Sequence, residues 1–206
     1  MKTIKLCLVA LLAMLSVGAN SQSFMAGYNV SMATTSDATA LNGFHAGLSG
    51  DYALKGKLSA QYALLYNLQQ LTAENTVLGQ TVTSTTNSHS LDLPVRLAYT
   101  MPIDNKLSVI GFAGPNLNYY LSQKTTIETS GLINSTTEGD NIYTLENGDG
   151  KKYYSPFDIQ FGIGAGIKYN SISIRVSYDW GLLDRDLLSD DVWKNNDLKI
   201  SLAYTL

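Results

Sequence analysis

A histidine flanked by hydroxyl and acidic side chains is the first candidate for catalytic chemistry in this sequence. His89 stands between Ser88 and Ser90, and Asp92 follows closely. A serine, a histidine and a carboxylate can hydrolyse an ester only when their side chains lie within hydrogen-bond reach of one another. In an extended strand His89 points to one face, whereas the two serines and Asp92 point to the other. We therefore predict no catalytic residue here, and we expect His45 to be a polar residue of the protein interior.

Two acidic segments are candidates for cation binding. The segment 146–150 (Glu-Asn-Gly-Asp-Gly) is similar to half a calcium loop, but it lacks the spacing and the final glutamate of an EF-hand. Asp184, Asp186, Asp190 and Asp191 could hold a divalent cation or bridge to lipopolysaccharide through one, although a solvated acidic loop is the commoner outcome. The sequence has no phosphate-binding glycine loop and no cysteine–histidine metal spacing. We predict no metal site and no cofactor.

The N-terminal stretch predicts export. Lys2 and Lys5 precede an apolar run and a small-residue cleavage site, so we predict a cleaved signal peptide at 1–21 and one domain at 22–206. Cleavage removes the only cysteine, Cys7, and with it any disulfide chemistry. The formal net charge of −3 gives no support for nucleic-acid binding.

Eight segments after the signal peptide alternate between apolar and polar residues, which is typical of β-strands with one apolar face. They span 24–32, 43–54, 58–68, 91–99, 107–121, 157–169, 172–180 and 198–206. Most are long enough to cross a bilayer as tilted strands. Short connections alternate with long ones, so strands running up and down would place all short turns at one end. The polar stretches 72–88 and 124–150 are either surface loops or strand extensions above a membrane.

The apolar face could contact lipid outside a barrel or line the inside of a soluble one. A lipocalin-like barrel also has eight strands, but its apolar row points inward. Charged residues make up only 15% of this chain, whereas ordinary soluble domains have about 25%. Aromatic residues also gather at the ends of the apolar rows, as in the two interfacial girdles of membrane barrels. The predicted interfacial aromatics are Phe44, Tyr52, Tyr66, Tyr99, Tyr119, Phe157, Tyr169, Tyr178, Trp180 and Tyr204.

The polar row then lines a narrow lumen. An eight-stranded barrel is only wide enough to be filled by side chains, and buried charges persist only when they are paired. A two-residue turn at 170–171 would place Arg175 opposite Gly166 and Asp179 opposite Gly162, and pairing through 102–105 would place Pro94 near Ala113. We predict a closed lumen with an ion-pair network of Asp51, Asp92, Arg96, Asp158, Lys168, Arg175, Asp179 and Lys199.

Several segments resemble the PorT-like outer-membrane β-barrel family. They are Leu91-Asp92-Leu93-Pro94-Val95, Gly111-Phe112-Ala113-Gly114-Pro115, Tyr119-Tyr120-Leu121, Phe161-Gly162-Ile163-Gly164-Ala165-Gly166 and Tyr178-Asp179-Trp180-Gly181-Leu182. The resemblance covers the whole chain after the signal peptide. It implies an eight-stranded barrel in the outer membrane and, for most members, no assigned activity.

These observations together predict an all-β, eight-stranded, antiparallel up-and-down transmembrane barrel in the outer membrane of a Gram-negative bacterium. Its short turns would face the periplasm and its long loops the outside. We expect a monomeric structural or interaction platform, not an enzyme, that contacts outer-membrane lipid, lipopolysaccharide, the assembly machinery and an envelope protein complex. The alternatives are a lipid-modifying enzyme, of the lipid A deacylase or acyltransferase type, and a soluble lipocalin-like periplasmic binder of an apolar ligand.

Overall fold

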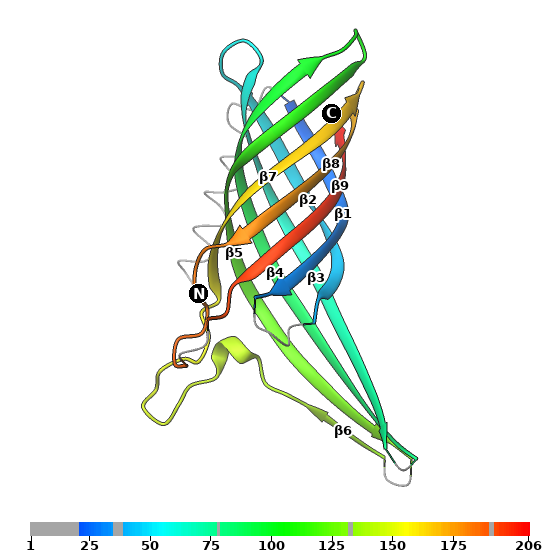
Figure 1. The fold of residues 1–206 in the computed structure, drawn as a ribbon, viewed down its shortest axis with the longest axis vertical. Helices are drawn as coiled ribbons and strands as arrows, with labels where there is room; N and C mark the ends of the chain where they lie inside the picture. Colours follow the sequence, from blue (N-terminus) through cyan, green and yellow to red (C-terminus); the bar gives the residue numbers. More distant parts are fainter. Residues whose placement is uncertain (1–20, 35–38, 78, 132–133, 190–191) are drawn as a thin grey trace.

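Long antiparallel strands form a closed ring in the computed structural model of the protein (Figure 1). The structure describes residues 21–34, 39–77, 79–131, 134–189 and 192–206. Within these ranges the strands are β1 (Ser21–Ala33), β2 (Leu41–Ala53), β3 (Leu58–Val77), β4 (Gln80–Pro102), β5 (Leu107–Ser130), β6 (Ser135–Glu138), β7 (Phe157–Tyr169), β8 (Ile172–Gly181) and β9 (Asn195–Thr205). One 3-10 helix, η1, spans Ile142–Thr144. The predicted signal peptide lies outside the described residues, apart from Ser21, which begins β1.

The ring closes without a free edge in the barrel wall. The strand order is β4-β3-β2-β1-β9-β8-β7-β5, and an additional pairing between β4 and β5 completes the circle. All neighbours in the wall are antiparallel. Closure pairs the backbone N–H and C=O groups of each wall strand with those of its neighbours. A β-sheet can cross a lipid bilayer only when these groups are paired in this way. The predicted fold class is confirmed.

The three strands β3, β4 and β5 are longer than the sequence pattern indicated. Residues 72–77 and 80–88 continue β3 and β4 as a paired hairpin, and 124–130 continue β5. Of the two alternatives for the polar stretches, strand extension is correct for these residues. The short strand β6 adds to the end of β5 through the pairs Thr126–Glu138 to Thr129–Ser135, and neither β6 nor η1 was expected.

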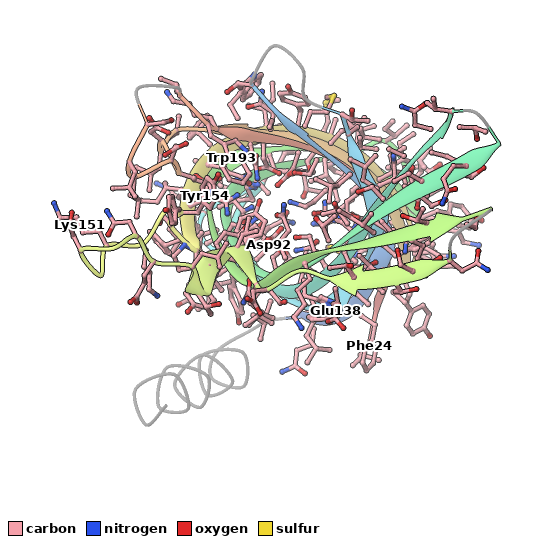
Figure 2. All side chains as sticks on the ribbon, turned by 90° about the horizontal axis from the view of Figure 1, so that it is seen from below. Phe24, Asp92, Glu138, Lys151, Tyr154 and Trp193 are labelled. Carbon is pink, nitrogen blue, oxygen red and sulfur yellow. The ribbon has the colours of Figure 1, made fainter. Side chains whose placement is uncertain are left out.

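The apolar rows face outward: Figure 2 shows Phe24 pointing away from the ring and Asp92 lying inside it. Ile163 is 49% exposed and Ile174 is 58% exposed on the outside of the ring, whereas Asp179 is 1% exposed inside it. A lipocalin-like binder would have the opposite arrangement, so that alternative is wrong. None of the helices in the described part of the chain is long and apolar enough to span a membrane.

The predicted aromatic residues all lie on the outside of the barrel, and all but Tyr178 are exposed. Tyr178 packs edge-on against Trp180, with ring centroids 5.0 Å apart. The strand register aligns them at the two ends: Tyr119 pairs with Phe157 at the long-loop end, and Tyr204 pairs with Ile172 next to Tyr169 at the short-turn end.

The register near the two prolines differs from the prediction. Pro94 pairs with Asn116 instead of lying near Ala113, because the connection between β4 and β5 is wider than the assumed tight turn. In that connection the backbone N–H groups of Lys106 and Leu107 donate to Asp104 Oδ1 at 2.7 and 2.8 Å. The register through the 170–171 turn is as predicted, with Arg175 opposite Gly166 and Asp179 opposite Gly162.

Candidate functional site in the lumen and at the long-loop end

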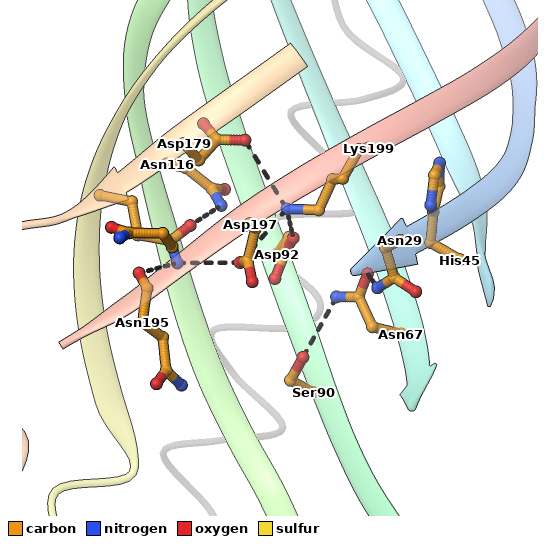
Figure 3. A network of polar contacts seen from close by, with 12 residues as sticks. Asn29, His45, Asn67, Ser90, Asp92, Asn116, Asp179, Asn195, Asp197 and Lys199 are labelled. Atoms are coloured by element: carbon orange, nitrogen blue, oxygen red, sulfur yellow. Dashed lines mark hydrogen bonds and ion pairs between the residues drawn. The ribbon is translucent and has the colours of Figure 1, made fainter. Parts of the chain in front are cut away.

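Lys199 on β9 is the centre of a buried ion-pair network inside the barrel (Figure 3). Its Nζ lies 2.7 Å from Asp92 Oδ2, 3.6 Å from Asp197 Oδ2 and 3.7 Å from Asp179 Oδ2. Arg96 binds the other carboxylate oxygen of Asp179. All five residues are buried. Two cations and three carboxylates therefore cross-link strands β4, β8 and β9 through the lumen.

The structure brings together four of the eight charged residues predicted to meet in the lumen, namely Asp92, Arg96, Asp179 and Lys199. The network also contains Asp197, which the sequence analysis missed because the last alternating segment was begun at Leu198. Extending the alternation back would have found it, since Asn195, Asp197 and Lys199 share the inward row of β9.

The other four predicted residues face inward without joining this network, and on this point the prediction needs correction. Asp51 accepts a long hydrogen bond from Ser21 Oγ at 3.5 Å. Asp158 is fully buried without an ion pair in the described residues. Within the same ranges, no carboxylate oxygen lies within 4.0 Å of Lys168 or Arg175. The physical reason is position along the strands: Asp51, Lys168 and Arg175 lie on the short-turn side of Lys199, which pairs with Ser177, and Asp158 lies on its long-loop side.

Neutral amides fill much of the remaining lumen. Asn67 accepts from Asn29 Nδ2 at 3.0 Å and donates to Ser90 Oγ at 3.1 Å. On the other side Gln160 accepts from Asn116 at 2.8 Å and donates to Asp197 Oδ2 at 2.8 Å (Figure 3). His45 Nε2 lies 2.8 Å from Ser201 Oγ, so His45 belongs to the interior as expected. The lumen is packed with hydrogen-bonded side chains, as the small circumference requires.

The long-loop end is covered by a cluster around Arg185. The guanidinium carbon lies 3.7 Å from the Tyr120 ring centroid and 5.1 Å from that of Trp193. Arg185 also donates to the Tyr143 hydroxyl at 2.5 Å and to the Ser155 carbonyl. Burial raises the pKa of the Tyr143 phenol, so its hydroxyl stays protonated at neutral pH. Arg185 was not predicted from the sequence, because its acidic neighbours are typical of a solvated loop.

The carboxylates of that acidic segment accept hydrogen bonds from nearby backbone N–H groups. Asp184 Oδ1 accepts from the N–H groups of Asp186 and Trp193, at 3.1 and 2.9 Å. Asp186 accepts from the N–H of Ser189, which lowers the pKa of its carboxyl group. The described residues contain no group of three His, Cys, Asp or Glu side chains that could hold a metal ion. Asp190 and Asp191 lie outside the described residues.

The remaining candidates also have local partners. His89 Nδ1 lies 2.6 Å from the hydroxyl of the outward-facing Tyr66, whereas Ser90 and Asp92 are buried inside. No serine or carboxylate of the described chain hydrogen-bonds to His89. Segment 146–150 forms a turn in which Asn147 Oδ1 accepts from the N–H of Asp149 at 2.9 Å. This geometry does not assemble a triad or an EF-hand.

The chain matches a known protein family, but its sequence differs strongly from those of the solved proteins it resembles. Residues 11–186 match the family described as "Outer membrane protein beta-barrel domain". No curated protein sequence matches the chain.

Three similar solved structures have a low sequence identity to this chain. Ail, the attachment invasion locus protein of Yersinia pestis, in complex with the heparin analogue sucrose octasulfate, shows 14% identity and a TM-score of 0.45, covering 90% of this chain and 98% of its own. Neisserial surface protein A shows 12% identity and a TM-score of 0.45, covering 92% and 99%. The outer membrane enzyme PagL shows 13% identity and a TM-score of 0.44, covering 89% and 98%.

Proposed function

Because this chain belongs to the outer membrane protein beta-barrel domain family, we propose that it is a membrane-anchored interaction platform whose long-loop end meets a protein partner. The chain is an integral β-barrel of the Gram-negative outer membrane. The barrel wall provides the anchor, and the largely filled lumen leaves the outside surface as the region available for contact with another protein. On this proposal the predicted aromatics lie at the two lipid interfaces.

The observation that carries the proposal is a sheet that stands beyond the barrel. We call it the extended sheet, and it consists of residues 71–77, 80–88, 123–130 and 135–138. Figure 1 shows β3, β4 and β5 running past the ends of the other strands to the tip that carries β6. From Tyr66 to Val77, at roughly 3.3 Å per residue, β3 continues for about 35 Å along its own direction.

The two faces of the extended sheet differ in charge. Cross-strand pairs and their hydrogen bonds, such as Thr86–Thr125 at 2.9 Å, show which side chains share a face. The face that continues the lumen side has no charged residue among Leu71, Ala73, Asn75, Val77, Gln80, Val82, Ser84, Thr86, Thr125, Ile127, Thr129, Ser135 and Thr137. The opposite face carries Glu74, Lys124, Glu128 and Glu138.

The uncharged face also exposes large apolar side chains. Val77 is 60% exposed, Val82 is 38% exposed and Ile127 is 44% exposed. Apolar side chains that gather on one uncovered face above the membrane are typical of a protein-interaction surface. We therefore propose that an envelope protein partner docks on this uncharged face, while the barrel itself stays monomeric.

The other proposed contacts follow from the placement of the barrel in the membrane. The outward apolar rows contact lipid, the long-loop end adjoins lipopolysaccharide, and the assembly machinery handles the chain during insertion. The lipid-modifying alternative has weaker support, because the hydrogen bond of His89 to Tyr66 engages a phenol instead of a nucleophile. Comparing lipid A from cells with and without the protein by mass spectrometry would test it, since an altered acylation pattern would favour an enzyme.

A shortened hairpin tests the platform. Leu71 pairs with Thr86, so joining them through an Asn-Gly turn removes the tip of the hairpin and keeps the register below it. In outer membranes, cross-linking from position 127 should capture a partner with the full-length chain. The same cross-link should be lost in the shortened variant and in Val82→Asp, but kept in the control Glu74→Gln. Unchanged cross-linking in the shortened variant, with the barrel folded, would refute the proposal.

A further inference from the structure

A cavity of about 60 Å³ lies inside the barrel on the side of the short turns. Its walls combine apolar side chains, such as Met25 and Leu65, with the polar residues Asp51, Gln61 and Arg175. At about 15 Å³ for each water position, the space corresponds to roughly four water molecules. A molecule of about four or five non-hydrogen atoms would therefore fill it.

Arg175 is the cation of the wall that has no carboxylate within ion-pair distance among the described residues, and Asp51 is its acidic neighbour across the cavity wall. Its Nη1 donates to Gln61 Oε1 at 3.1 Å, its Nε donates a long hydrogen bond to Ser173 Oγ at 3.4 Å, and its guanidinium carbon lies 5.8 Å from the Phe112 ring centroid. Within the described ranges no carboxylate oxygen lies within 4.0 Å of it, whereas Arg96 and Lys199, which line the same cavity, both have such partners. A half-buried cation with a neutral hydrogen-bond partner and an aromatic ring attracts an anion.

The entrance to this half of the barrel is basic. Three lysines lie in the turns that border it, namely Lys55, Lys57 and Lys106. A fourth, Lys168, faces inward on β7, one residue pair before the end of the strand. The acidic residues of the same end are Asp51 and Asp104. An excess of positive charge at the mouth raises the local concentration of anions and excludes cations.

We propose that this cavity binds a small carboxylate that enters from the short-turn end, the periplasmic end in outer-membrane barrels. The guanidinium fork of Arg175 donates two parallel hydrogen bonds to the carboxylate, and Gln61 holds the fork in place. The apolar wall around Met25 and Leu65 accommodates a short alkyl group. Asp51 lines the same cavity, and its like charge weakens the binding. This site is independent of the platform proposed above, because it uses the opposite end of the barrel.

Acetate is the probe that tests the site. The refolded full-length chain in zwitterionic detergent is titrated with sodium acetate at constant ionic strength, and the Arg175 Nε–H resonance is followed by NMR. We expect a saturable shift for the wild type. Arg175→Lys keeps the charge but loses the fork, so acetate should bind about tenfold more weakly. Asp51→Asn removes the like charge and should bind acetate about threefold more tightly.

Two controls separate the cavity from its basic rim. Citrate is too large for the cavity, so a tenfold excess should not displace acetate if the site is internal. Lys57→Gln should change the apparent affinity much less than Arg175→Lys, because Lys57 does not line the cavity. The proposal is overturned if acetate gives only a linear, non-saturating shift, if citrate competes as well as acetate, or if Asp51→Asn weakens binding. Gel-mobility shift on boiling confirms that each variant is folded.

Discussion

Replacement of Lys199 by methionine should cost more stability than a similar change at any surface lysine. The Lys199 ammonium is the ion-pair partner of both Asp92 and Asp197 among the described residues, whereas Asp179 also has Arg96. Lys199→Met therefore leaves two buried carboxylates without a cation. Removing one member of a buried ion pair costs about 3–5 kcal/mol, and we expect the loss to lie in that range at neutral pH.

A double-mutant cycle with Asp92→Asn measures the direct attraction. Asp92→Asn alone leaves Lys199 with two other carboxylates, 3.6 and 3.7 Å away, and should cost about 1–3 kcal/mol. In the double variant the side chain at position 92 is neutral, so it loses no ion pair when Lys199 is replaced. The loss of unfolding free energy in the double variant should therefore be smaller than the sum of the two single losses by about 1–3 kcal/mol. The assay is reversible urea unfolding in lipid vesicles, followed by tryptophan fluorescence and by gel mobility.

The matched control is Lys124→Met. Lys124 lies 2.8 Å from Glu138, but the two side chains are 47% and 63% exposed, and solvent screens such pairs. We expect no measurable change in unfolding free energy. If Lys199→Met also stays within about 1 kcal/mol of the wild type, the attraction of the ammonium for its carboxylates only offsets the cost of removing it from water, and the reasoning is refuted.

Two further predictions concern packing and pH. A Cβ added at Gly162 would clash with Asp179 Oδ1, whereas one at Gly111 would meet nothing within 4 Å. Gly162→Ala should therefore cost about 1–3 kcal/mol in urea unfolding and Gly111→Ala should not, and equal effects would contradict this account. The pKa of Asp186 is depressed below its ordinary 3.8 by the Ser189 N–H, so its contribution to loop order is present above the unfolded pKa and lost as the pH falls through the folded one. The Ser189 amide resonance should titrate below pH 3.8 in NMR spectra and lose this step in Asp186→Asn; a step at or above 3.8 would contradict it.

The barrel could be predicted from the sequence because apolar and polar residues alternate with a period of two along its wall strands. Each wall strand has lipid on one side and a packed polar lumen on the other, so alternation alone assigns the faces. The two-residue turn at 170–171 added a second clue. It predicted the register between β7 and β8 correctly, and in that register Gly162 and Gly166 lie across from the large side chains of Asp179 and Arg175.

The ends of the barrel follow no comparable pattern in the sequence. Arg185 is held by rings from β5, η1 and its own loop, and contacts between distant loops leave no periodic trace. The shift at Pro94 has a local cause, the capping of the turn by Asp104. For residues 72–88 and 124–130 of the extended sheet, the sequence left loop and strand extension as alternatives, because threonines and serines with water on both faces resemble loop residues.

The polar lumen and the extended sheet are linked through strand register. A slip of one residue in β9 would turn Lys199 and Asp197 toward lipid and Leu198 and Ile200 into the lumen. The ion pairs of Lys199 with Asp92 on β4 and Asp179 on β8 make such a slip costly across the barrel. Because β4 lies between β3 and β5 in the extended sheet, the same ion pairs hold the β4 side chains on their two faces of that sheet, and the register shift at His89 and Ser90 sets the faces of β5. Charges buried in the lumen thus contribute to the surface that the protein presents outside the membrane.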